Sequence, residues 1–193
     1  MKTFVATTAA SLIVHHMGLS QPSSIPDPNS APNGDVPSGP VVIVVPRSQT
    51  DWKKYYDLRW RVLRAPWNQP RGSEKDDREA ESQHLMILGP NAEPVAAGRL
   101  HFNSPAEAQV RYMAVAPEAQ GRGLGSAILR ELERRARAAG AQSIVLNARE
   151  NAQPFYARHG YKVVGSAPTL YDAIKHVRMR KDLNFAPVAD RHP

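Results

Sequence analysis

The chain has 193 residues, of which 41% are hydrophobic and 22% are charged, and it contains no cysteine. This length is enough for one domain with a substantial core, and the absence of cysteine excludes disulfides, thiolate nucleophiles and cysteine-ligated metal sites. The net charge of +7 suits a polyanionic ligand and would equally suit nucleic acid. The sequence has no clustered Lys/Arg tract or nucleic-acid motif, so no nucleic-acid partner is predicted.

The first 40 residues are predicted to be a disordered extension. From Ser20 to Pro40 the chain is dominated by Pro, Ser, Asn and Gly, a composition that cannot bury enough apolar surface to become ordered. The apolar run from Phe4 to Val14 is too short to span a membrane. It is either a weak targeting segment or lies upstream of a start at Met17. A cytoplasmic protein without membrane association is expected, with a domain over 41–185 and a tail over 186–193.

The predicted elements alternate between strands and helices. The run Val41–Val45 is unbroken and apolar, which predicts a strand buried on both faces. Thr50 or Asp51 is expected to cap the first helix, and residues 65–80 form a polar loop. Further elements are expected, in chain order, as strands over 83–88, 94–102 and 109–115, a helix over 124–139 closed by Gly140, a strand over 143–147, a short helix over 151–158, and strands over 161–164 and 174–180. This alternation predicts an α/β or α+β domain.

The most informative stretch is the glycine-rich segment between the strand at 109–115 and the long helix. Pro117 ends the strand, and Gly121, Gly123 and Gly125 lead into the helix. Bare backbone N–H groups at a helix start bind phosphate. A nucleotide P-loop would need a lysine before Ser126, and the glycine spacing does not fit a dinucleotide fingerprint. A plain flexible loop is the alternative interpretation.

Gln120, Gly123 and Gly125 form a Gln-x-x-Gly-x-Gly pattern that resembles the acyl-CoA pyrophosphate loop of the GNAT family of N-acetyltransferases. The preceding residues Met113–Glu118 are similar to that family's fourth strand. The resemblance implies a GNAT fold, in which a mixed, mostly antiparallel sheet of about seven strands splays at the fourth and fifth strands and is flanked by helices. It implies acetyl-CoA as cosubstrate, bound by Met113, Val115, Gln120, Gly121, Arg122, Gly123, Gly125, Ser126 and Asn151.

A second segment, from Ala148 to Tyr161, resembles another GNAT hallmark. Tyr156 matches the tyrosine that donates a proton to the departing CoA thiolate in that family, and a phenol is a suitable acid for this step. The alternative is that Tyr156 only packs its helix on the sheet. The family's asparagine seven residues earlier is Arg149 in this sequence, so Asn151 is expected to make the pantetheine contact instead.

The nearest branch by resemblance is the ElaA-like acetyltransferases, on the basis of the segment Leu58–Leu63 and the closing segment Ile174–Met179. This similarity implies an acceptor cleft that contains Arg59, Glu74, Asp77, His84 and His176. The last four are candidates to deprotonate the amine, and the sequence does not choose among them. No histidine or carboxylate spacing indicates a metal site.

The sequence therefore predicts an acyl-CoA-dependent N-acyltransferase in which a primary amine attacks the thioester directly. The alternative is a non-catalytic acyl-CoA-binding sensor or interaction module. A homodimer is an assembly that the sequence leaves open.

Overall fold

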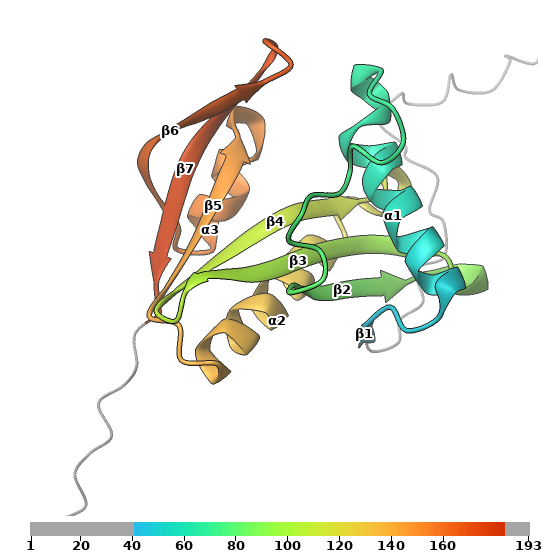
Figure 1. The fold of residues 1–193 in the computed structure, drawn as a ribbon, viewed down its shortest axis with the longest axis horizontal. Helices are drawn as coiled ribbons and strands as arrows, with labels where there is room; N and C mark the ends of the chain where they lie inside the picture. The colour runs from blue at the N-terminus through green and yellow to red at the C-terminus, as the bar shows by residue number, and fades with distance from the viewer. Residues whose placement is uncertain (1–40, 184–193) are drawn as a thin grey trace, which may run out of the picture. The chain divides into compact units, whose positions relative to one another are not determined.

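The structure is a computed structural model that describes residues 41–183. They form a seven-stranded mixed sheet with the strand order β1-β2-β3-β4-β5-β7-β6 (Figure 1). The strands are β1 (Ile43–Val44), β2 (Gln83–Leu88), β3 (Pro94–Ser104), β4 (Glu107–Val115), β5 (Ser143–Arg149), β6 (Lys162–Leu170) and β7 (Ile174–Asp182). Every neighbouring pair is antiparallel except β4 and β5, which are parallel. The predicted mixed, mostly antiparallel sheet is confirmed.

Three α-helices accompany the sheet in this part of the chain: α1 (Gln49–Leu63), α2 (Leu124–Ala138) and α3 (Gln153–Arg158). Helices α1 and α2 cover opposite faces, because successive side chains of a strand point to opposite sides. In β3, a Cβ at Gly98 would touch Ile128 of α2, whereas the next side chain, Arg99, shares Glu79 with Arg59 of α1. No helix among the described residues is long and apolar enough to cross a membrane.

The first strand differs from its prediction. It is only two residues long and pairs with β2 alone, so it is an edge strand. Val41 and Val42 are 50% and 64% exposed. The prediction of a strand buried on both faces was wrong, because an unbroken apolar run does not reveal whether a second strand or a helix covers it.

The helix termini follow from local sequence. Ser48 is the N-cap of α1: its Oγ accepts from the Asp51 N–H at 3.1 Å, while the Asp51 carboxylate accepts from the Ser48 N–H at 3.0 Å. This is a capping box, and it corrects the predicted cap at Thr50 or Asp51. Gly140, at φ +88°, follows α2 as predicted. The Gly140 N–H donates to the Arg137 carbonyl oxygen at 2.9 Å, and the Ala141 N–H donates to the Ala136 carbonyl oxygen at 3.0 Å. This pair of hydrogen bonds is a Schellman motif.

Strands β4 and β5 splay apart, as expected for the predicted fold, but earlier than the predicted position after Val115. Their parallel pairing runs from Glu107 with Ser143 to Gln109 with Val145 and then stops. Figure 1 shows the two strands diverging from this short paired stretch. The predicted extension over 1–40 and the tail over 186–193 lie outside the described residues.

Candidate active site

The glycine segment forms the turn from β4 into α2. After Val115, a short 3-10 turn over Pro117–Ala119 buries Ala119. Gly121 and Gly123 both have φ +74°, which side chains rarely adopt and glycine adopts freely. Gly123 is the N-cap of α2, and its carbonyl accepts the Ala127 N–H at 3.0 Å. The N–H groups of residues 124–126 are therefore those that a helix leaves without internal partners.

A pocket of about 740 Å³ opens between the splayed strands and reaches this turn. Its wall includes most of the residues predicted to bind acyl-CoA, the predicted acid Tyr156, and one of the residues predicted for the acceptor cleft, His176. The predicted acyl-CoA residues in the wall are Met113, Val115, Gln120, Gly121, Gly123, Gly125, Ser126 and Asn151. Arg122 does not line this pocket; its side chain is exposed and borders a second hollow with Arg130 and Arg134. The structure thus brings together residues from β4, α2, α3 and β7.

The pocket side of β4 carries a bulge at Tyr112. The register of β3 and β4 shifts between Ala97 and Arg99, and Tyr112 has φ +55°, which is unusual for a bulky residue. Bulges redirect side chains next to functional sites. The Tyr112 ring lies under the Arg59 guanidinium, whose Cζ is 3.9 Å from the ring centroid. Nothing in the sequence pattern indicated this bulge.

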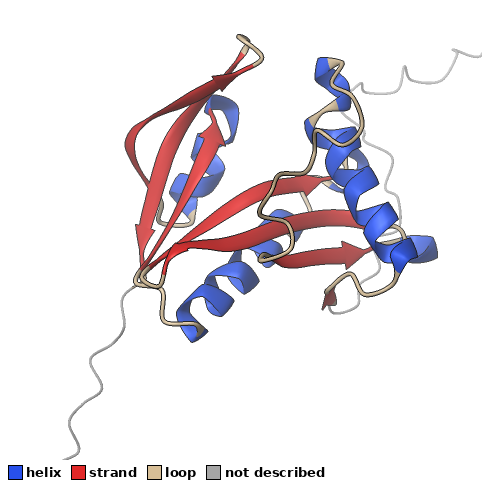
Figure 2. Cartoon of the chain, in the orientation of Figure 1, coloured by secondary structure: helices blue, strands red, loops and turns tan. Residues whose placement is uncertain are grey.

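A buried ionic network supports the bulge from the α1 side. Arg59 and Arg99 have fully buried side chains and share Glu79: Arg59 Nη2 lies 2.8 Å and Arg99 Nη1 2.6 Å from its Oε1. Arg99 also donates to Asp76 Oδ2 at 2.9 Å, and Tyr112 Oη donates to the same oxygen at 3.2 Å. Figure 2 shows the connection between α1 and β2, which carries Asp76 and Glu79, running across the sheet in tan. The network ties this connection to β3 and β4.

Four residues expected in the acceptor cleft do not line the pocket. Arg59 belongs to the buried network. Glu74 is buried and accepts the Gly72 N–H at 2.7 Å, and Asp77 is exposed on the loop. His84 is buried, with Nε2 2.8 Å from the Glu79 carbonyl oxygen and Nδ1 3.3 Å from Tyr55 Oη. The resemblance placed these four residues in one acceptor cleft, whereas Arg59 and His84 both contact Glu79 inside the fold, and Glu74 and Asp77 remain on the loop.

Tyr156 lies on α3 and is only 8% exposed. Its ring packs edge-to-face on Phe155 and Tyr161, with centroids 5.0 and 5.9 Å away. Among the described residues its hydroxyl has no hydrogen-bond partner, although the side chain borders the pocket. Burial raises the pKa of Tyr156 well above its usual value, so the phenol is protonated at neutral pH. It is an available proton donor at the pocket wall.

His176 of β7 has a defined tautomer when it is neutral. Its Nδ1 lies 2.8 Å from the Ile174 carbonyl oxygen; because a carbonyl only accepts, Nδ1 carries the proton and Nε2 keeps its lone pair. Burial, together with the nearby charges of Arg149 and Arg64, lowers the pKa of His176. The imidazole is therefore neutral near pH 7 and can accept a proton at Nε2.

Several polar or charged residues that line the pocket were not among the predicted site residues: Arg64, Gln109, Arg111, Tyr112, Asn147, Arg149 and Arg158. Arg149 stood out in the sequence only as a departure from the resemblance, and its contact with α1 could not be read from spacing. The Oγ of Ser126, in α2, lies 2.9 Å from Nε2 of His159, the residue that follows α3. That contact joins the two helices at the inner end of the glycine turn.

Comparisons with known proteins agree with the fold and the site described above. Residues 69–183 match the family model described as an acetyltransferase (GNAT) domain. The uncharacterized N-acetyltransferase YjcF of Bacillus subtilis (strain 168) is 31% identical over 139 residues, which make up 72% of this chain and 98% of YjcF.

Two solved structures share the fold. An aminoglycoside 6'-N-acetyltransferase complexed with coenzyme A has a TM-score of 0.62 at 15% identity, over 76% of this chain and 99% of that one. ElaA of Escherichia coli has a TM-score of 0.59 at 16% identity, over 72% and 97% of the two chains. The splayed sheet, the glycine turn at a helix start and the family match agree, and the chain belongs to the GNAT family of N-acetyltransferases.

Proposed function

We propose that the protein transfers an acyl group, acetyl in the simplest case, from acyl-CoA to a primary amine by direct attack. One observation carries this proposal: a single pocket joins the unpaired N–H groups at the start of α2 to the gap between β4 and β5, with Tyr156 in its wall. The first part suits a pyrophosphate, and the second can admit the pantetheine arm as an added strand. Met113 and Val115 border this gap, where a backbone N–H can stabilise the oxyanion.

The chemistry needs one base and one acid. The amine gives a proton to His176 Nε2, and its nitrogen lone pair forms a bond with the thioester carbonyl carbon. The carbon–sulfur bond then breaks, and the thiolate takes the phenolic proton of Tyr156 as the amide is released. No covalent enzyme intermediate is required, in keeping with a chain without cysteine. Before the next turnover His176 releases the proton that it took from the amine and Tyr156 regains one, so the net reaction moves one proton from the amine to the thiol.

Replacing Gly123 by Val tests the acyl-CoA site. A Cβ at Gly123 would have no protein atom within 4 Å, but the residue has φ +74°, a conformation that valine adopts only with strain. We expect the backbone to change and the acetyl-CoA affinity, measured by calorimetry, to fall at least tenfold, about 1.4 kcal/mol. Gly72→Val is the matched control, because Gly72 has φ +98° with equal space but lies outside the pocket. Equal affinities in the Gly123→Val variant and the control would contradict the assignment.

The role of His176 predicts a pH dependence. The base must be neutral to act, and the pKa of His176 is lowered, so kcat should be full near pH 7 and fall only as the pH drops through a midpoint below about 6.5. His176→Gln should lose this acid limb and reduce kcat by roughly 10² or more. His159→Gln is the control, since His159 does not line the pocket. An unchanged acid limb in the His176 variant would show that another group is the base.

A further inference from the structure

The pocket wall carries positive charge and no carboxylate. Among the described residues that line it there is no Asp or Glu, but there are four arginines, at positions 64, 111, 149 and 158. Arg111 already has a carboxylate partner in Asp76, whose Oδ2 lies 3.0 Å from Arg111 Nη1. Arg158 is the last residue of α3 and is exposed. Arg64 and Arg149 remain to be explained.

These two guanidinium groups converge on one carbonyl oxygen. Arg64 Nη1 and Arg149 Nη2 donate to the Leu63 carbonyl oxygen at 3.1 and 3.3 Å. Arg64 Nε also donates to the Ser73 carbonyl oxygen at 2.8 Å. Within residues 41–183, neither arginine forms a salt bridge. Burial and the charge of Arg64 both lower the pKa of Arg149. Two like charges held together at a pocket wall favour a bound anion between them.

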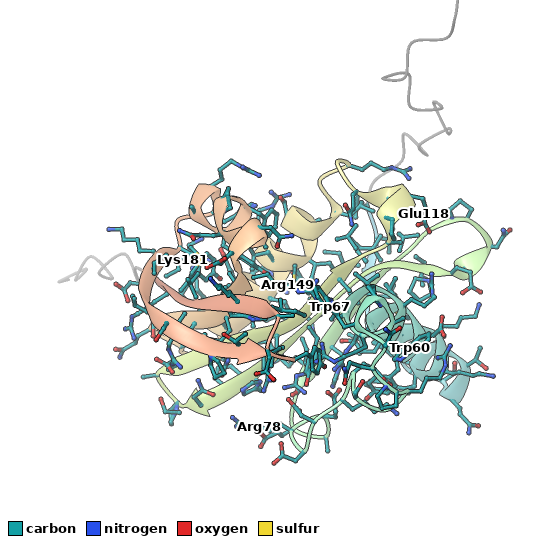
Figure 3. All side chains as sticks on the ribbon, turned by 90° about the horizontal axis from the view of Figure 1, so that it is seen from above. Trp60, Trp67, Arg78, Glu118, Arg149 and Lys181 are labelled. Carbon is teal, nitrogen blue, oxygen red and sulfur yellow. The ribbon has the colours of Figure 1, made fainter. Side chains whose placement is uncertain are left out.

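The position of the pair bears on whether the acyl-CoA or the acceptor amine would carry the anionic group. Arg149 of β5 is directly opposite His176 of β7 in the antiparallel ladder, so the two side chains share a face of the sheet. Arg64 caps the end of α1. In the view of Figure 3, Arg149 lies near the middle of the molecule, apart from Glu118, which marks the turn that leads to the glycine segment, and from Arg78 at the lower edge. Arg149 thus adjoins the proposed base, and Arg64 shares the Leu63 carbonyl oxygen with it.

The carboxylates that could have attracted a cationic acceptor are occupied elsewhere. Asp76 and Glu79 are held by Arg99 and Arg59, and Glu74 is buried outside the pocket. We propose that Arg64 and Arg149 bind an anionic group, a carboxylate or a phosphate, on the acceptor amine, and that polycationic amines are poor acceptors. A pair of guanidinium groups supplies several directed donors to such a group. This inference rests on the proposed acyl transfer and specifies its substrate class.

The test compares matched acceptors on the full chain with acetyl-CoA, by thiol release. The pairs are glycine with glycinamide, alanine with alaninamide and O-phosphoethanolamine with ethanolamine, and spermidine is the polycation. We expect wild type to prefer the anionic member of at least one pair, and Arg149→Gln to reduce that preference at least tenfold, mainly through KM. The wild-type-to-variant ratio cancels differences in amine pKa within a pair. Arg61→Gln is the control, because Arg61 is exposed on α1 and does not line the pocket.

Other outcomes separate the two proposals. If acetyl-CoA does not bind by calorimetry, acyl transfer itself is wrong. If amines are acetylated but Arg149→Gln leaves acceptor preference unchanged, or spermidine is the best acceptor, the arginine assignment is overturned. As a further comparison, succinyl-CoA replaces acetyl-CoA as the acyl donor. If Arg149→Gln loses activity with succinyl-CoA but keeps the wild-type acceptor preference, the anionic group belongs to the acyl donor, and the arginine assignment is also overturned. If no amine of the panel reacts, the binding of N-acetylglycine to the CoA-loaded protein is compared with that of N-acetylglycinamide. The proposal is supported only if wild type binds the carboxylate more tightly and Arg149→Gln abolishes this preference.

Discussion

Tyr156→Phe is expected to lower kcat by about 10² or more while acetyl-CoA affinity stays nearly unchanged. The substitution removes one oxygen from a side chain whose hydroxyl makes no hydrogen bond to the described residues, so the packing on Phe155 and Tyr161 is retained. The lost rate then reports the proton that the phenol gives to the thiolate. This is the pattern of an interaction made mainly in the transition state. Single-turnover thiol release and calorimetry measure the two quantities.

Tyr161→Phe is the matched control for this variant. Tyr161 is buried against Tyr156 but does not line the pocket, so its hydroxyl should be irrelevant to the chemical step. If kcat for Tyr156→Phe equals that of Tyr161→Phe while chemistry limits the rate, Tyr156 is a packing residue. The thiolate would then take its proton from water.

Glu79→Gln is expected to cost several kcal/mol of unfolding free energy, about 3–5 as is typical when one partner of a buried ion pair is removed. The reason is that Arg59 and Arg99 have fully buried side chains and would keep their positive charges with one fewer carboxylate. The melting temperature should fall by roughly 10 °C. Because the network holds the Tyr112 bulge, acetyl-CoA affinity should also decrease.

Glu81→Gln is the control for this variant, since Glu81 is mostly exposed and, within residues 41–183, its one salt bridge is with Arg78 at the surface. Such pairs contribute little to stability. A melting temperature for Glu79→Gln within a degree or two of the control would contradict the account of the network. The pH dependence has a definite sign: burial opposes ionisation of Glu79, but Arg59 and Arg99 outweigh it and lower its pKa. Its stabilisation is therefore present at neutral pH and is lost as acid protonates the carboxylate.

Much of the fold could be predicted because local signals and long-range packing agree. Strand β2 has the predicted bounds, 83–88, and α2 begins at the predicted Leu124, because a short apolar run before a turn and a four-residue apolar repeat are both buried in the folded chain. The glycine turn was recognisable for the same reason: its backbone angles require glycine. Strand β6 runs to Leu170, six residues beyond its prediction, because its pairing with β7 extends past the apolar residues.

The arrangement of charges could not be predicted. Arg59 and Glu79 are twenty residues apart, and only the path of the connection between α1 and β2 brings them together. From the sequence, an arginine that faces a cleft cannot be distinguished from an arginine that is buried beside a carboxylate. The same holds for Arg64 and Arg149, which meet at the Leu63 carbonyl oxygen across 85 positions of the chain. Which residues line the pocket thus depends on the tertiary structure, and composition and spacing do not predict it.

The most direct test of acyl transfer is to incubate the full chain with acetyl-CoA and the amine panel, and to follow free thiol and acceptor mass together. The account predicts amine-dependent thiol release that matches, mole for mole, an acetyl group gained by the acceptor, and that is lost in Tyr156→Phe. Tight acetyl-CoA binding without thiol release or acetylated product for any amine, and without binding of an N-acetylated product to the CoA-loaded protein, would contradict it and would identify the protein as a non-catalytic acyl-CoA-binding module.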